Sequence, residues 1–193
     1  MASIIKVDDV QDASGNNIIN ESGDTITIGA SGDTITIPSG ATFNVAGTPG
    51  TNIGKILQIV QGTTSTETRN NTNVLADTTL TADITPVSTS NKVLVTVMQN
   101  GCDKSSANAS NQLVLKLLRG ASVISTFANN VTYTNTAVVN SIGTVGTMYL
   151  DSPSTTSATT YKTQLSSGNN TAGVGVQGTG GETSTITLME VAG

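Results

Sequence analysis

The sequence predicts an all-β protein with two parts. The N-terminal part is a repetitive β-stem that forms an intertwined trimer. The C-terminal part is an antiparallel β-sandwich, jelly-roll-like in type. Three observations support this prediction. Charged residues make up only 11% of the 193 residues, and Thr, Ser, Asn and Gly are abundant instead. Thr favours strands, whereas Gly, Asn and Ser favour turns. A short unit repeats before residue 50, and longer alternating segments follow it.

The first element is an arm, residues 1–13. Ile4, Ile5 and Val7 form a short apolar strand that is followed by acidic residues. An extended peptide of this kind can add a strand to the sheet edge of another protein. The arm is therefore expected to dock the protein on a larger assembly. A disordered terminus is the alternative.

The second element is the repeat region, residues 14–50. The heptapeptide SGDTITI occurs at 22–28 and again at 31–37, and related units precede and follow it. Successive Ser-Gly pairs begin at Ser14, Ser22, Ser31 and Ser39, a spacing of 8, 9 and 8 residues. Each unit combines a turn signal with a strand that has one apolar and one hydroxylated side.

One chain has too few apolar residues in these units to bury their apolar side. Repeats must stack or associate to form a continuous core, and three chains around one axis also hide the strand edges. The residues expected at the trimer interface of the stem are Ile18, Ile26, Ile28, Ile35, Ile37, Phe43 and Val45. A flexible Gly/Ser/Thr linker and a solenoid within one chain are the alternatives.

The third element is the sandwich, residues 51–193, which begins after Pro49-Gly50. Alternation of apolar and polar residues predicts its strands, and the turn within 112–126 falls at residues 119–122. The expected strands are 54–62, 79–86, 91–100, two within 112–126, and others near 130–139, 142–150, 157–165, 171–177 and 183–191. The apolar segment 91–100 is expected to be central. Eight to ten antiparallel strands of this length fit a sandwich, with the jelly roll the leading candidate.

Several segments resemble those of short virion structural proteins of marine tailed bacteriophages, such as cyanophages. They are MASIIKVDDVQDASGN, IPSGATFNVAGT, GKILQIVQ, ITPVSTSNKVLVTVMQNGC, LKLLRG, LDSPSTTSATTYKTQ and STITLMEVAG. The resemblance covers nearly the whole chain. It implies a homotrimeric fibre with a virion-proximal N-terminus, a repetitive stem and a C-terminal knob. It implies no catalytic residues.

Composition excludes several other classes of protein. A net charge of −5 with eight Lys and Arg argues against a nucleic-acid surface. Apolar runs are shorter than about 18 residues, so no membrane insertion is expected, and the N-terminus lacks the form of a secretory signal. Cys102, the single cysteine, cannot form an internal disulfide. It has no His or basic neighbour in sequence, so we expect a structural thiol.

Catalytic and metal sites are not expected, and neither is a cofactor. The chain has no His, which excludes the common Ser-His and Cys-His nucleophile pairs. A polysaccharide-degrading tailspike would instead need two carboxylates about 5 to 10 Å apart. The acids considered are Asp8, Asp9, Asp12, Asp24, Asp33, Asp77, Asp83, Asp103, Asp151, Glu182 and Glu190. Rings of Asp24 and Asp33 in a trimer could hold Ca²⁺, although solvated turn residues are the simpler interpretation.

Two polar loops, 101–111 and 166–173, are the candidate binding elements of the knob, because loops at one end of a sandwich present side chains on a rigid scaffold. Their amides and hydroxyls could bind a host-surface glycan, or the loops could be inert connections. The sequence thus predicts a non-enzymatic tail or head fibre on the virion surface, assembled in the host cytoplasm and used for host attachment. A capsid decoration protein is the alternative, and a tailspike is a weaker one.

Overall fold

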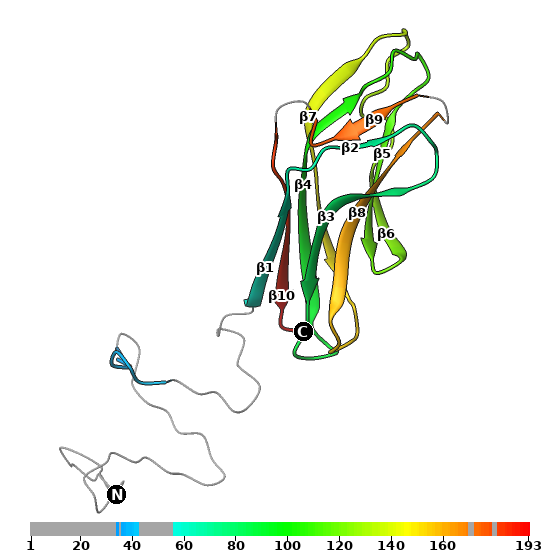
Figure 1. Cartoon of the computed structure of the whole chain (residues 1–193). Coiled ribbons are helices and arrows are strands. Elements are labelled where there is room, and N and C mark those ends of the chain that lie inside the picture. Colours follow the sequence, from blue (N-terminus) through cyan, green and yellow to red (C-terminus); the bar gives the residue numbers. More distant parts are fainter. Residues whose placement is uncertain (1–33, 35, 43–55, 170–171, 179–180) are drawn as a thin grey trace, which may run out of the picture. The chain divides into compact units, whose positions relative to one another are not determined.

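The computed structural model describes residues 34, 36–42, 56–169, 172–178 and 181–193 (Figure 1). The chain divides into two compact units, Met1–Thr51 and Asn52–Gly193. In the described part of the first unit, residues 36–42 form a turn but no strand. Gly40, with φ of 88°, lies in this turn, which the backbone hydrogen bond from Ala41 N to Pro38 O closes at 3.1 Å. The Ser-Gly turn signal is therefore confirmed at this copy of the repeat.

The second unit is all-β, and its described residues contain ten strands and no helix. The strands are β1 (Ile56–Thr64), β2 (Thr68–Asn70), β3 (Ala76–Ile84), β4 (Lys92–Lys104), β5 (Leu113–Arg119), β6 (Ser122–Ala128), β7 (Asn140–Asp151), β8 (Thr159–Ser167), β9 (Val174–Val176) and β10 (Ser184–Val191). One sheet has the order β1-β10-β4-β9-β2 with β7 on the other side of β4, and the second has the order β3-β8-β5-β6.

The strands pair as nested hairpins. β1 pairs with β10, β2 with β9, β3 with β8, β4 with β7 and β5 with β6, all antiparallel. The chain is therefore arranged as one long hairpin, and wrapping of this hairpin brings β10 and β9 beside β4 and β8 beside β5. The expected all-β fold with two antiparallel sheets is confirmed, and the nested pairing has the form of a jelly roll.

The tip of the long hairpin is the turn between β5 and β6. Arg119 pairs with Ser122, so Gly120 and Ala121 form a two-residue connection. Gly120 has φ of 57°, a conformation that a two-residue hairpin turn with Gly in its first position requires. The turn expected at residues 119–122 is confirmed, and so is the central position of β4, which has a partner strand on each side.

The core between the sheets consists of two apolar clusters with a polar layer between them. On β4, Gln99 follows Val97 of the first cluster and precedes Cys102 of the second. On β8, Thr163 lies between Tyr161 and Leu165 in the same way. Thr163 Oγ1 donates to Gln99 Oε1 at 2.8 Å, which joins the two sheets. Such a satisfied buried hydrogen bond favours one strand register, because a one-residue slip would leave both groups unpaired.

Three expectations about the strands require correction. The segment expected to be a strand near 130–139 is a loop, because the chain crosses here from β6 in one sheet to β7 in the other. The expected loop 101–111 begins as strand, since β4 continues to Lys104 and pairs there with β9. The three-residue strand β2 was not expected, because its alternation is too short to detect.

The two ends of the sandwich differ. Ile56 at the start of β1 pairs with Val191, and Gly193 N donates to Asn91 Oδ1 at 3.1 Å. The chain therefore enters and leaves the sandwich at one end, which we call the proximal end (Figure 1). The links at the proximal end are 85–91, 120–121 and 152–158, and those at the opposite, distal end are 65–67, 71–75, 105–112, 129–139, 168–173 and 177–183. Within the described residues no helix is long and apolar enough to span a membrane.

Candidate functional site

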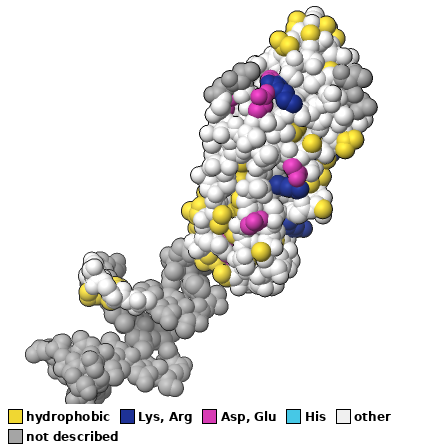
Figure 2. Space-filling model, viewed as in Figure 1, with side chains coloured by type: hydrophobic (Ala, Val, Ile, Leu, Met, Phe, Trp, Pro, Cys, Tyr) yellow, Lys and Arg dark blue, Asp and Glu magenta, His cyan; other side chains and the backbone are white. Residues whose placement is uncertain are grey.

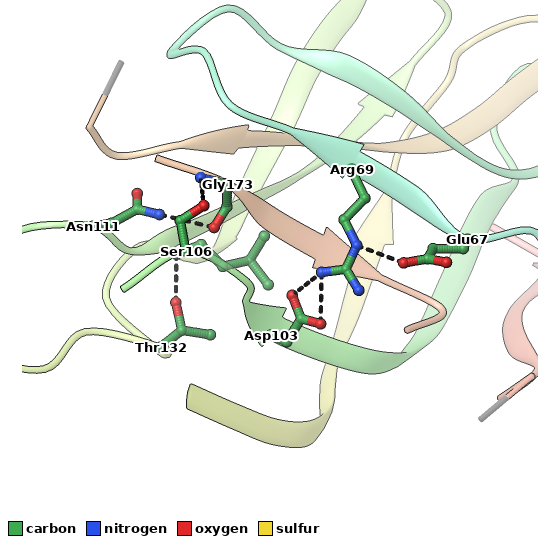
Figure 3. Close-up of polar contacts among 8 residues, drawn as sticks. Glu67, Arg69, Asp103, Ser106, Asn111, Thr132 and Gly173 are labelled. Atoms are coloured by element: carbon green, nitrogen blue, oxygen red, sulfur yellow. Dashed lines mark hydrogen bonds and ion pairs between the residues drawn. The ribbon is translucent and has the colours of Figure 1, made fainter. Parts of the chain in front are cut away.

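The candidate functional site is the distal end, where the two loops proposed from the sequence lie side by side. Gly173 O accepts hydrogen bonds from Ser105 N at 3.0 Å and from Asn111 Nδ2 at 3.0 Å, and Gly173 N donates to Ser106 Oγ at 3.0 Å (Figure 3). Ser167 Oγ donates to Asn111 Oδ1 at 2.6 Å. The structure thus brings together residues from 101–111 and 166–173, which are far apart in the sequence.

A third loop, 129–139, is attached to this pair by two side chains. Thr132 is buried, and its Oγ1 accepts a hydrogen bond from Leu113 N at 2.8 Å. Lys104 is also buried, and its Nζ donates to Asn108 O at 2.8 Å and to the hydroxyl of Thr134. One ammonium group therefore connects the loop after β4 with the loop after β6. Because hydrogen bonds hold the loop bases, the tips are presented from a fixed frame.

The tip of loop 129–139 is the most apolar part of the distal end. Tyr133 is 51% exposed, and Val131, Val138 and Val139 of the same loop are exposed as well. Figure 2 shows hydrophobic side chains gathered at this extremity of the sandwich. A tyrosine ring with a free face can stack on a sugar ring, and its hydroxyl can make a hydrogen bond. Aromatic residues are scarce in this chain, with three Tyr, two Phe and no Trp, and the local sequence does not show that Tyr133 lies at the tip.

An ion pair lies on the side of the distal end, across β9. Arg69 Nη1 donates to Asp103 at 2.5 and 2.7 Å, and Arg69 Nε donates to Glu67 at 2.5 Å (Figure 3). Arg69 and Asp103 both pair with Gly175 in the sheet, one from each side. A Cβ atom at Gly175 would lie 2.7 Å from Arg69 Nη1, so glycine leaves the room that this ion pair needs.

A small hollow adjoins this ion pair. It has a volume of about 120 Å³ and is lined by Gly101, Cys102, Asp103, Ser141, Gly143, Gly178 and Glu182. Ligand pockets usually measure about 300 to 1,000 Å³, so this hollow is too small for a sugar unit. Because Arg69 neutralises Asp103, the arrangement does not resemble a pair of free carboxylates ready for acid and base catalysis.

Two of the other acids considered from the sequence, Asp77 and Asp151, have structural partners. Asp77 pairs with Lys162 at 2.9 Å, and Asp151 pairs with Arg119 at 2.8 Å. Asp151 also accepts a hydrogen bond from Tyr161 at 2.6 Å, and burial together with this contact raises the pKa of the tyrosine. Among the described residues, no group of three or more His, Cys, Asp or Glu side chains could hold a metal ion.

Most residues of the predicted stem interface and docking arm lie outside the described residues. These are Ile4, Ile5, Val7, Ile18, Ile26, Ile28, Ile35, Phe43 and Val45, together with Asp24 and Asp33. Ile37 is described and is 48% exposed in the single chain. An isoleucine exposed to this degree leaves apolar surface that another chain could cover, but the trimer itself stays a prediction.

Cys102 is buried, and burial is the main reason why the pKa of its thiol is raised to about 12. We expect its reaction with an aromatic disulfide reagent at pH 8 to be at least about a thousandfold slower than that of an exposed thiol, because only the thiolate reacts. The folded chain and a Thr89→Cys variant, with the new thiol in an exposed link, provide the comparison. Rapid modification of one thiol in the unaltered folded chain would contradict this assignment.

The sequence matches no protein-family model and no curated protein sequence.

Proposed function

We propose that this protein is a non-enzymatic structural component of a bacteriophage virion, a trimeric tail or head fibre whose knob attaches to the host surface. The observation that carries the proposal is the polarity of the sandwich. β1 begins and β10 ends at the proximal end, whereas hydrogen bonds join three of the links at the distal end. A domain attached at one end and elaborated at the other suits a display function.

The chemistry of the distal end supports a glycan as the ligand. Ser105 and Ser110 are exposed, and Asn108 is partly exposed beside them, so hydroxyl and amide groups are available to sugar hydroxyls. Tyr133 adds a ring for stacking at the tip. Each such site would be weak because it has one aromatic residue. Three sites on a trimer and many trimers on a particle could still bind a cell surface tightly through avidity.

The N-terminal arm provides the test of virion attachment. A chain that lacks residues 1–13 is expected to keep the mass of a trimer in light scattering but to be lost from purified particles. The matched control is the full chain carrying the same epitope tag, which should be incorporated and label a few positions on each particle. Normal incorporation of the shortened chain would refute the docking role, and hundreds of labels spread over the head would refute the fibre.

A further inference from the structure

The outer side of the first sheet is apolar near the proximal end, although it faces solvent in the single chain. Ile59 of β1, Met189 of β10, Leu94 of β4 and Leu150 of β7 are cross-strand neighbours and form one continuous row. Ile59 is 60% exposed and Leu150 is 51% exposed. We call this surface the apolar face; it comprises Leu57, Ile59, Leu94, Met98, Met148, Leu150, Met189 and Val191.

The two outer surfaces of the sandwich differ in charge. On the outer side of the first sheet, Lys92 is the one charged residue among the outward residues of four strand segments. These segments are β1, β10, the first half of β4 and the last half of β7. The outer side of the second sheet instead carries Asp77, Asp83, Lys116 and Lys162. In Figure 2, charged side chains lie over β3 and β8, and hydrophobic side chains gather along β1 and β10.

We propose that the apolar face is the contact between knobs in a homotrimer, so that its occupant is the same face of two further copies of this chain. This inference rests on the proposed trimer. Two copies of one face present the same charges to each other, so a face that carries no carboxylates avoids the repulsion expected in a chain of net charge −5.

Chain connectivity supports the same occupant. The short segment between Gly50, where the expected stem ends, and Ile56, where β1 begins, spans at most about 20 Å. Three stems joined around an axis therefore hold the starts of three β1 strands close to that axis. The fully apolar row lies near this start, and the next rows towards the distal end contain Gln61 and Thr63. In the proposed trimer, the most apolar part of the face therefore lies at the proximal end, where the stems would hold the three copies closest together.

The width of the sheet suits a trimer. Four strands at a spacing of about 4.8 Å give a face about 19 Å wide, and three such faces enclose a triangular prism whose walls lie about 5.5 Å from the axis. Half the usual separation of packed sheets is about 5 Å. Side chains from three faces can therefore fill the prism. In this arrangement, β1 of each copy meets β7 of the next copy at the corners.

The test is interchain cross-linking of the full-length variant Ile59→Cys/Leu150→Cys, with oxidation and a short bismaleimide as the two reagents. Within one chain these positions are three strand spacings apart, about 14 Å, whereas a disulfide needs Cα atoms within about 7 Å. Cys102 is buried and contributes little background. We expect covalent dimers and trimers on a denaturing gel, with at least tenfold more product than in the control.

The control is Thr81→Cys/Val123→Cys, on the edge strands β3 and β6 of the second sheet, which lie in one row and have the same spacing. Light scattering on the same samples separates the possible failures. Two results would overturn the apolar-face contact without contradicting the proposed trimeric fibre. One is a trimer in which the Ile59→Cys/Leu150→Cys variant forms no cross-links, and the other is a trimer in which both variants cross-link equally. A monomer overturns both the contact and the proposed trimer. Covalent dimers without trimers overturn the threefold arrangement.

Discussion

Replacement of Glu190 by alanine is expected to lower the free energy of unfolding by about 3 kcal/mol, because the variant would lose three hydrogen bonds to a buried carboxylate and leave the buried amide of Asn91 without this acceptor. Glu190 is buried on β10. Its carboxylate accepts hydrogen bonds from Gln58 Nε2 at 2.5 Å, Asn91 Nδ2 at 2.6 Å and Val87 N at 2.7 Å. This one side chain therefore joins β1, the link 85–91 and β10 at the proximal end.

The same carboxylate makes the stability of the sandwich sensitive to acid. Burial opposes ionisation of Glu190, but the hydrogen bonds from Gln58, Asn91 and Val87 outweigh it and hold the pKa of the carboxyl below its usual value. A depressed pKa in the folded state gives stability that is present above the unfolded pKa, about 4.5, and is lost as the pH falls through the folded pKa. The sandwich should therefore unfold more readily in acid.

Urea unfolding at pH 7 and at steps below pH 5 measures both effects. The control is Glu67→Ala, which removes an exposed acid of the Arg69 ion pair and should change the free energy of unfolding by less than about 1 kcal/mol. The Glu190→Ala variant should also lose part of the acid dependence of the unaltered chain. Equal stability of the two variants at pH 7 would show that the hydrogen bonds to Glu190 do not hold the proximal end together.

The double variant Ile35→Asp/Ile37→Asp is expected to abolish the stem trimer, yielding monomeric or shortened species. Both residues belong to the apolar side of the second SGDTITI copy. In a trimer, each chain would place two carboxylates against the common axis. An unpaired buried charge costs several kcal/mol, and like charges around one axis repel each other as well. Light scattering and sedimentation of the full-length variant measure the outcome.

The matched control is Thr34→Asp/Thr36→Asp, which adds the same charges to the hydroxylated side of the same repeat. This variant should stay trimeric, because the hydroxylated side is expected to face solvent. An unchanged trimer in the isoleucine variant would argue against a stem whose apolar row faces a shared axis. If both variants dissociate equally, the added negative charge disrupts the trimer regardless of whether it lies on the apolar or the hydroxylated side of the strand.

The sequence predicted most sandwich strands well, because most of them are bounded by turn residues and either alternate in polarity or, like β4, form a short apolar run. β5 and β6 with their turn at Gly120, and the central strand β4, were found in this way. The segment 130–139 was predicted wrongly, since alternation alone does not show whether a partner strand is available. The two polar loops were recognised by composition, but Arg69, Lys104 and Thr132 were missed because nothing in their local sequence indicates contacts with distant segments.

The sequence by itself determined the fold class, most strands and the polar character of the distal loops, because these depend on neighbouring residues and on a period of two. Only the tertiary structure decided which distant segments meet. Glu190 contacts Gln58, 132 residues earlier, because the wrapped hairpin places β10 beside β1. The apolar face was also decided by the fold. β4 is apolar on both sides, and packing of the second sheet against Val93, Val95 and Val97 leaves Leu94 and Met98 on the outside.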